Sequence, residues 1–242
     1  MPPTRPSIHA TDRGLLRAVA DGDARLTPEQ SLTLLREMPL PELGFWADER
    51  CRTLHGDAIR TYVIDRNINY TNVCTAKCTF CAFRRDEGDG DAYVLPVDRI
   101  LHKIQELVDI GGTQILMQGG MHPGLPLSWY EDLLRAIGQR FPQVHVHAFS
   151  PPEFVEFARF FDPPGADLRE KVRWVMVRLR DAGLRSVPGG GGEIFAPAVR
   201  RKIGLGKCSG EDWLTVMHVA HELGRSEEHT SELQSQFRIS YA

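Results

Sequence analysis

Three cysteines within eight residues form the densest group of reactive side chains in this chain. Cys74, Cys78 and Cys81 follow a strand-like run with the spacing C-x3-C-x2-C. Iron–sulfur clusters are held by cysteine thiolates, so three thiolates on such a short loop can hold three corners of one cuboidal cluster. The remaining iron would have no protein ligand. An open iron beside a cofactor pocket is what the reductive cleavage of S-adenosylmethionine requires.

The same cysteines have three other possible uses. A structural zinc site normally has four ligands, and no second cysteine pair or histidine pair follows at usable spacing. A disulfide with a spare thiol needs an oxidising compartment, which nothing in the composition supports. Plain buried thiols are the third alternative. We favour a 4Fe-4S cluster with Cys74, Cys78 and Cys81 as its ligands.

The segments around the cysteines resemble a known family. The spacing, with Phe80 directly before the last cysteine, is similar to that of the radical S-adenosylmethionine superfamily. Four further stretches indicate one family within this superfamily, namely residues 65–74, 114–120, 147–151 and 188–191. Together they resemble the cyclic dehypoxanthinylfutalosine synthases of the futalosine route to menaquinone. Aminofutalosine synthases and the deazaflavin-forming FO synthases are the nearest relatives, and the likeness covers about residues 11–224.

This resemblance implies both the chemistry and most of the site. S-adenosylmethionine would chelate the unique iron, and one electron from a donor such as flavodoxin or ferredoxin would cleave it to a 5′-deoxyadenosyl radical. The radical would abstract hydrogen from the ribose of a small nucleoside-derived substrate, dehypoxanthine futalosine, and the sugar radical would attack the benzoate ring. The implied cofactor contacts are Phe80, Gln118, Gly119, Gly120, Ser150 and Glu153.

Several of these residues also have a plain structural explanation. Phe80 could be an ordinary packing residue, and Gly119-Gly120 an ordinary turn. Ser150 has the position of a helix N-cap, and Glu153 in the first turn suits the helix dipole. Both explanations stay open for each of these residues.

The cyclisation must also release a proton, which needs a positioned base with a suitable pKa. The candidates near strand ends are His122, His147, Glu153 and Glu193, and the sequence does not choose among them. Glu193 follows four glycines, whereas the family has Gly-Gly-Gly-Ala-Glu, so Gly192 departs from the pattern. His145 shares a strand face with His147, and we expect both to line a barrel. Cys208 is expected to lie in a loop without partners.

The composition is that of an ordinary globular protein. The chain has 242 residues, of which 42% are hydrophobic and 25% charged, and a formal net charge of −3. This balance gives no electrostatic reason to expect nucleic acid or an anionic membrane as a partner. We find no run of 18 apolar residues and no apolar core of a signal peptide near the N-terminus. We therefore expect a cytoplasmic protein with no membrane contact.

The elements that must position the site alternate between strands and helices from residue 58 onward. Strands are expected at about 60–68, 114–117, 144–149 and 185–187. Such alternation predicts a parallel sheet with the site at the carboxyl ends of its strands, as in βα barrels. The preceding residues 11–55 are expected to be helical, with Thr27 as an N-cap and an apolar stripe of Leu32, Leu34 and Leu35.

Three segments follow from this pattern. Residues 1–57 are expected to be a helical N-terminal extension, and residues 58–224 a radical-SAM TIM-type barrel truncated after about four βα units. Residues 225–242 are polar and resemble a translated sequencing adaptor, so we expect an artefactual tail on a truncated fragment. The function expected of the parent protein is that of the radical cyclase. The alternatives are an aminofutalosine synthase, an FO synthase subunit, a non-catalytic zinc-binding module or an inactive fragment.

Overall fold

The computed structural model describes residues 11–56 and 62–224 of the chain. The chain divides into two compact units, Met1–Tyr62 and Val63–Ala242. Both the expected boundary at residues 57 and 58 and the expected tail 225–242 lie outside the described residues.

The described part of the first unit is helical, as expected. Its helices are α1 (Thr11–Asp21), α2 (Pro28–Glu37) and α3 (Leu40–His55). Thr27 caps α2, because its side chain accepts from the Gln30 N–H at 3.2 Å and its own N–H donates to the Gln30 side chain at 2.8 Å. The expected leucine stripe is wrong in part: Leu34 is buried, whereas Leu32 and Leu35 are 45% and 40% exposed.

The second unit is built on a parallel sheet whose strands lie in the order β1-β3-β4. The strands are β1 (Asp65–Ile68), β3 (Gln114–Met117) and β4 (His145–Ala148). The register aligns Ile68 with Met117 and Met117 with Ala148, so the three strands end at the same edge of the sheet. This confirms the predicted βα alternation and the expectation that the segments after the strands meet.

The predicted fourth strand at 185–187 is wrong. This segment lies beside β4 as an isolated parallel bridge between Ser186 and His147. The Arg185 N–H donates to the Val146 carbonyl at 3.1 Å and the Ala148 N–H donates to the Ser186 carbonyl at 3.0 Å, but the pairing extends no further. The sequence analysis also missed a short antiparallel pair, β2 (Lys77–Cys78) with β5 (Gly204–Leu205). Two-residue strands carry no alternation that a sequence pattern can detect.

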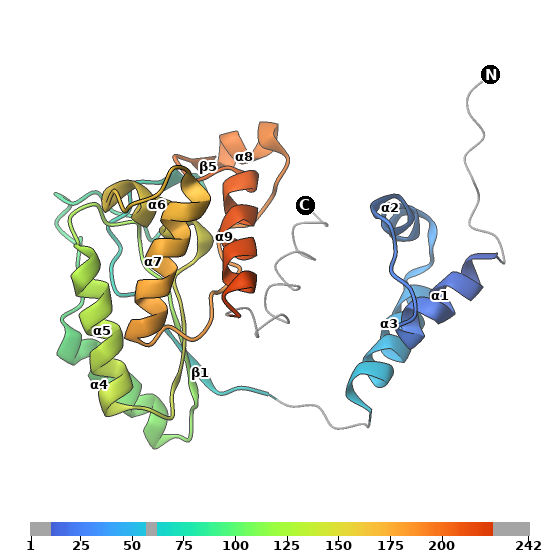
Figure 1. The fold of residues 1–242 in the computed structure, drawn as a ribbon, viewed down its shortest axis with the longest axis horizontal. Helices are drawn as coiled ribbons and strands as arrows, with labels where there is room; N and C mark the ends of the chain where they lie inside the picture. The colour runs from blue at the N-terminus through green and yellow to red at the C-terminus, as the bar shows by residue number, and fades with distance from the viewer. Residues whose placement is uncertain (1–10, 57–61, 225–242) are drawn as a thin grey trace. The chain divides into compact units, whose positions relative to one another are not determined.

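Helices pack around the sheet and bury the core of the second unit. They are α4 (Val97–Asp109), α5 (Leu127–Arg140), α6 (Pro151–Phe160), α7 (Leu168–Ala182), α8 (Pro197–Ile203) and α9 (Gly210–Glu222). Figure 1 shows α5, α7 and α9 side by side, and α6 also contacts α7 and α9. Tyr130 on α5 lies at the centre of an aromatic cluster, with ring centroids 4.7 Å from Phe157 and 5.5 Å from Phe149. None of the helices in the described part of the chain is long and apolar enough to cross a membrane.

We expect the core between these helices to dominate the stability of the second unit. Leu179 on α7 is fully buried, so the substitution Leu179→Ala should lower the free energy of unfolding by about 2–5 kcal/mol. Leu214 on α9 is 39% exposed, and Leu214→Ala should change it by less than about 1 kcal/mol. Urea unfolding followed by circular dichroism measures both, and equal losses would contradict this packing.

Candidate active site

The loop that carries the three cysteines is fixed at several points of its backbone. The Cys74 N–H donates to the Arg85 carbonyl at 3.1 Å, and the Thr75 N–H donates to the Met121 carbonyl at 3.1 Å. Farther along, the Thr79 N–H donates to the Ile203 carbonyl at 2.8 Å, next to the pairing of β2 with β5. The loop is therefore attached to the segments after β3 and after α8.

A cavity of about 290 Å³ opens beside this loop. Its lining includes nine of the residues singled out from the sequence, namely Cys74, Cys78, Phe80, Cys81, Gln118, Gly119, Gly120, Ser150 and Glu153. Gly190 and Gly191 of the four-glycine run line it as well, as does Lys207. The fold thus brings the cysteine loop, the glycine pair and the start of α6 to one cavity.

The glycine pair lies where no larger residue fits. A Cβ added at Gly119 would lie 2.4 Å from the Tyr70 ring, and one added at Gly120 would lie 2.0 Å from the Val73 carbonyl oxygen. The Gly120 N–H donates to the Thr71 carbonyl at 2.9 Å. Glycine is therefore required at both positions, at Gly119 by the approach of the Tyr70 ring and at Gly120 by the approach of the Val73 backbone.

Glu153 is a fully buried carboxylate with several donors around it. It accepts from the Tyr70 hydroxyl at 2.7 Å and from the Gly119 N–H at 3.2 Å. It also accepts from the Ser150 N–H and the Ser150 hydroxyl, each at 2.7 Å, as the third residue of a capping box at the start of α6. Burial raises the pKa of Glu153 above its ordinary value, and these hydrogen bonds offset only part of the rise. Glu153 thus joins the glycine pair to the helix start.

The donor set at the cavity suits a cluster better than a single ion. Burial raises the pKa of the Cys74 thiol, so metal binding there must release a proton to form the thiolate. In the described part of the chain, no three or more histidine, cysteine, aspartate or glutamate side chains are arranged to hold a metal ion. In a cuboidal cluster each thiolate binds a different iron, so its ligands do not have to converge on one point. Three thiols around one cavity fit that group.

Three of the four base candidates do not line this cavity. His122 is buried and accepts from the Gly124 N–H at 3.0 Å through Nδ1. His147 Nδ1 lies 2.6 Å from the Ser186 hydroxyl. Glu193 accepts from Lys207 Nζ at 2.7 Å. Of the candidates, Glu153 alone lines the cavity.

His145 and His147 project from the same face of β4 and share one partner. His145 Nε2 and His147 Nδ1 each lie 2.6 Å from the Ser186 hydroxyl. Burial, with His145 as a lesser cause, lowers the pKa of His147 to about 4. His147 is therefore neutral at physiological pH.

Sequence reasoning missed Tyr70 and Lys207 and misjudged Cys208. Tyr70 could have been predicted as a site residue, because it lies two residues after a strand. Lys207 could not, because it reaches the cavity through the pairing of β5 with β2, which the sequence does not reveal. Cys208 lies in a loop, as expected, but the expectation that it has no partners is wrong. It is 3% exposed, and its carbonyl accepts from Arg200 Nε at 2.8 Å, because Arg200 on α8 reaches back over it.

A protein-family model matches most of the chain. The model described as the radical SAM superfamily matches residues 68–233, which is more than half of the chain. The matched region contains all three cysteines of the loop and every residue found at the cavity. Its last residues fall within 225–242, the segment that the sequence analysis set aside.

Curated relatives of similar identity carry different names. The chain is 39% identical to a cyclic dehypoxanthine futalosine synthase from Halalkalibacterium halodurans, over 87% of this chain and 55% of that protein. It is 42% identical to an FO synthase from Streptomyces coelicolor, over 88% of this chain and 24% of that protein. A 5-amino-6-(D-ribitylamino)uracil--L-tyrosine 4-hydroxyphenyl transferase from a Cyanothece species is 40% identical, with 90% and 57% covered. The chain spans about half the length of two of these relatives and a quarter of the third.

Solved structures share the fold at low sequence identity. The crystal structure of methylornithine synthase (PylB) matches with a TM-score of 0.61 and 15% identity, over 86% of this chain and 56% of that one. This confirms the expected fold class, a partial radical SAM barrel. At such identity the likeness concerns the fold alone.

The close approach at Gly120 can be tested with a second glycine as control. Gly120→Ala should lower the free energy of unfolding by about 1–3 kcal/mol, because its Cβ would displace the Val73 carbonyl beside Cys74. It should also lower the iron bound per chain after anaerobic reconstitution. Gly138→Ala on α5 meets nothing within 4 Å and should be neutral or stabilising by up to about 1 kcal/mol. Iron retention by Gly120→Ala at the wild-type level would contradict this account of the cavity.

The buried His147 should make stability depend on pH. Its pKa is about 4 in the folded chain, whereas an unfolded histidine titrates near about 6.5. Between these values the unfolded chain binds a proton that the folded chain does not, so this part of the stability is complete above about pH 6.5 and is lost as the pH falls toward 4. The variant His147→Gln should lack it. Unfolding midpoints at pH 7.5 and pH 5 measure the difference, and an identical pH dependence in both proteins would exclude this role.

Proposed function

The chain belongs to the radical SAM superfamily, and within it we propose that the chain forms the cluster- and cofactor-binding part of a cyclic dehypoxanthine futalosine synthase. One observation carries the proposal. A single cavity is lined by the C-x3-C-x2-C cysteines, the Gly119-Gly120 pair and the Ser150–Glu153 helix start. Composition and fold alone would suit many enzymes, but this combination suits the reductive cleavage of S-adenosylmethionine.

Cys74, Cys78 and Cys81 would hold a 4Fe-4S cluster at the mouth of the cavity, where Cys81 is exposed. With S-adenosylmethionine bound, this cluster supplies a 5′-deoxyadenosyl radical after one-electron reduction. Exposure of Cys81, together with Phe80 at 54% exposed, leaves this side of the loop accessible. An electron-donor protein such as flavodoxin or ferredoxin would reach the cluster there.

The chain's own residues would orient S-adenosylmethionine and limit the space around it. Gly119 and Gly120 line the cavity, and their carbonyl oxygens would accept from the methionine ammonium group, since the two N–H groups already donate to Glu153 and Thr71. Glu153 accepts the Gly119 N–H at 3.2 Å and so fixes the direction of that peptide. Ser150, Gly190 and Gly191 would form the wall against the nucleoside part. The protein's part in cofactor chemistry of this kind is orientation and exclusion of side reactions.

The geometry assigns Glu153 a positioning role more readily than that of a base. Its oxygens already accept four hydrogen bonds from Tyr70, Gly119 and Ser150, so little capacity remains for a substrate proton. His122, His147 and Glu193 stay base candidates, although none of them lines the cavity. A small nucleoside-derived substrate remains the proposed partner, with neither nucleic acid nor a membrane. The thiol cluster favours a reducing compartment such as the cytoplasm.

A second candidate is the FO synthase reaction or the related aryl transfer. The observation that favours it is the identity of 42% and 40% to proteins with these names, which matches that of the cyclase relatives. The cyclase is favoured instead by the sequences of residues 114–120 and 147–151 and by the glycines at 189–192.

Substrate feeding separates the two candidates. Two proteins would be reconstituted anaerobically with iron and sulfide: the 242-residue chain, and a longer protein that continues from Gly224 with the coding sequence found downstream at the locus. Both would then be given dithionite and S-adenosylmethionine. Dehypoxanthine futalosine should yield 5′-deoxyadenosine and a product that has lost two hydrogen atoms. Turnover of 5-amino-6-(D-ribitylamino)uracil with L-tyrosine, and not of dehypoxanthine futalosine, would overturn the cyclase assignment.

Cysteine variants test the cluster itself. Serine at Cys74, Cys78 or Cys81 should each lower bound iron and abolish 5′-deoxyadenosine release, because an oxygen replaces one of three thiolate ligands. Cys51→Ser on α3, in the other unit of the chain, should leave both quantities as in the wild type. Iron retained in full by all three loop variants, or zinc in place of iron in the wild type, would exclude the site.

A further inference from the structure

Arg200 on α8 is a buried guanidinium whose donors are directed at backbone. Its side chain is 6% exposed. Nε donates to the Cys208 carbonyl at 2.8 Å, and Nη1 donates to the Gly192 carbonyl at 2.7 Å and the Ile194 carbonyl at 3.2 Å. Nη2 donates to the Gly191 carbonyl at 3.0 Å and faces the Cys208 sulfur at 3.8 Å. These five contacts use the full fork of a guanidinium.

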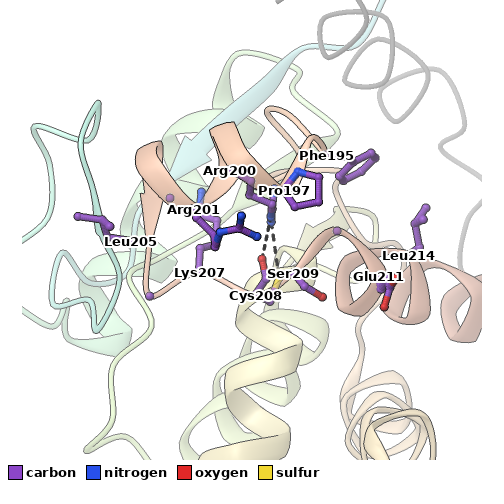
Figure 2. Close-up of a pocket in the computed structure, with 13 residues that line it drawn as sticks. Phe195, Pro197, Arg200, Arg201, Leu205, Lys207, Cys208, Ser209, Glu211 and Leu214 are labelled. Carbon is purple, nitrogen blue, oxygen red and sulfur yellow. Dashed lines mark hydrogen bonds between the residues drawn. The ribbon is translucent and has the colours of Figure 1, made fainter.

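Figure 2 shows where this fork lies. Arg200 points toward Cys208, at the wall of a second cavity of about 590 Å³. None of Cys74, Cys78 and Cys81 lines this second cavity, and Lys207 lines both cavities. The nearest carboxylate oxygen, on Glu193, is 3.8 Å away, and Glu193 is held more closely by Lys207 at 2.7 Å. Arg200 is therefore surrounded mainly by carbonyl groups, which is the pattern of a residue that shapes a loop.

The loop that it shapes has an unusual backbone. Gly191 has φ of 78° and Glu193 has φ of 35°, and the second value is one that a non-glycine residue rarely adopts. The carbonyls of this segment converge on Arg200, and the Gly190 carbonyl accepts from Trp213 Nε1 at 3.0 Å. Since Gly190 and Gly191 line the cysteine cavity, the shape of that wall depends on these contacts.

Through Nε, Arg200 also holds the segment after β5, which is attached to the cysteine loop. Cys208, the neighbour of Lys207, follows β5, and β5 pairs Gly204 with Cys78. Lys207 Nζ lies 5.2 Å from the centroid of the Phe80 ring, within the cysteine loop. Arg200 thus connects the glycine wall, through Cys208 and the β5 segment, with the cysteine loop that lines the same cavity.

We propose that Arg200 is a positioning residue that holds the glycine wall at the distance from the cysteine loop which S-adenosylmethionine binding requires. This inference rests on the proposed function, because it takes S-adenosylmethionine as the ligand of the cavity. Lysine cannot replace this residue, because an ammonium has three donors and no planar fork.

The test compares Arg200→Lys and Arg200→Gln with Arg201→Lys. Arg201 is the next residue of α8 and is exposed, so Arg201→Lys controls for the exchange of arginine for lysine on the same helix. Each full-length variant is measured in three ways: cleavage after Glu193 by a glutamate-specific protease in the metal-free chain, iron bound after reconstitution, and the dissociation constant for S-adenosylmethionine in the reconstituted chain.

Both Arg200 variants should become cleavable after Glu193, because the segment loses the carbonyl contacts that hold its backbone. Both variants should bind as much iron as the wild type. Their dissociation constant for S-adenosylmethionine should be about 10- to 100-fold higher, the effect known for residues that position direct ligands without contacting the bound group. Arg201→Lys should match the wild type in all three measurements.

Two results would overturn the proposal. One is wild-type affinity for S-adenosylmethionine in both Arg200 variants. The other is loss of iron in step with affinity, which is the behaviour of a residue needed only for folding. If the wild-type chain binds no S-adenosylmethionine, the proposed function fails. The cleavage measurement then still decides whether Arg200 holds the glycine segment, so the two failures can be told apart.

Discussion

The rest of the site depends on the buried carboxylate of Glu153. Its donors Tyr70, Gly119 and Ser150 each lie two residues beyond the end of a strand, β1, β3 and β4 in turn. A carboxylate this deeply buried is costly unless hydrogen bonds satisfy it. The three strand ends are therefore held together by the hydrogen bonds that one buried carboxyl group needs, and these bonds place the glycine pair beside the cysteines.

The opposite side of the cavity is fixed by residues much later in the chain. Thr79 in the cysteine loop bonds to Ile203, a separation of 124 residues, and β2 pairs with β5 there. Arg200 then ties this same region to the glycine wall through backbone carbonyls. The cavity is thus closed by local strand ends on one side and by a long-range contact on the other.

This division explains what the sequence could predict. Strand β3, α7 and the cysteine spacing follow from periodicity and residue type, and the glycines after β3 mark the close approach found at Gly120. Arg200 and Lys207 could not be found in this way, because their roles depend on contacts between segments far apart in the chain. From the sequence, Glu153 could equally have been a first-turn acid that suits the helix dipole or a residue of the site. Only the structure shows that the Tyr70 hydroxyl donates to it at 2.7 Å. The segment expected as a strand at 185–187 does bond to β4 through Arg185 and Ser186, but its pairing is a single bridge and not a strand.

In the proposed site, three thiolates would leave one iron of a 4Fe-4S cluster for a ligand from outside the protein. Mössbauer spectroscopy of the ⁵⁷Fe-reconstituted full chain, with and without S-adenosylmethionine, tests it most directly, because it resolves each iron of a cluster. The account predicts that the cofactor changes the signal of one iron and leaves the others as they were. A spectrum that the cofactor does not alter would contradict it.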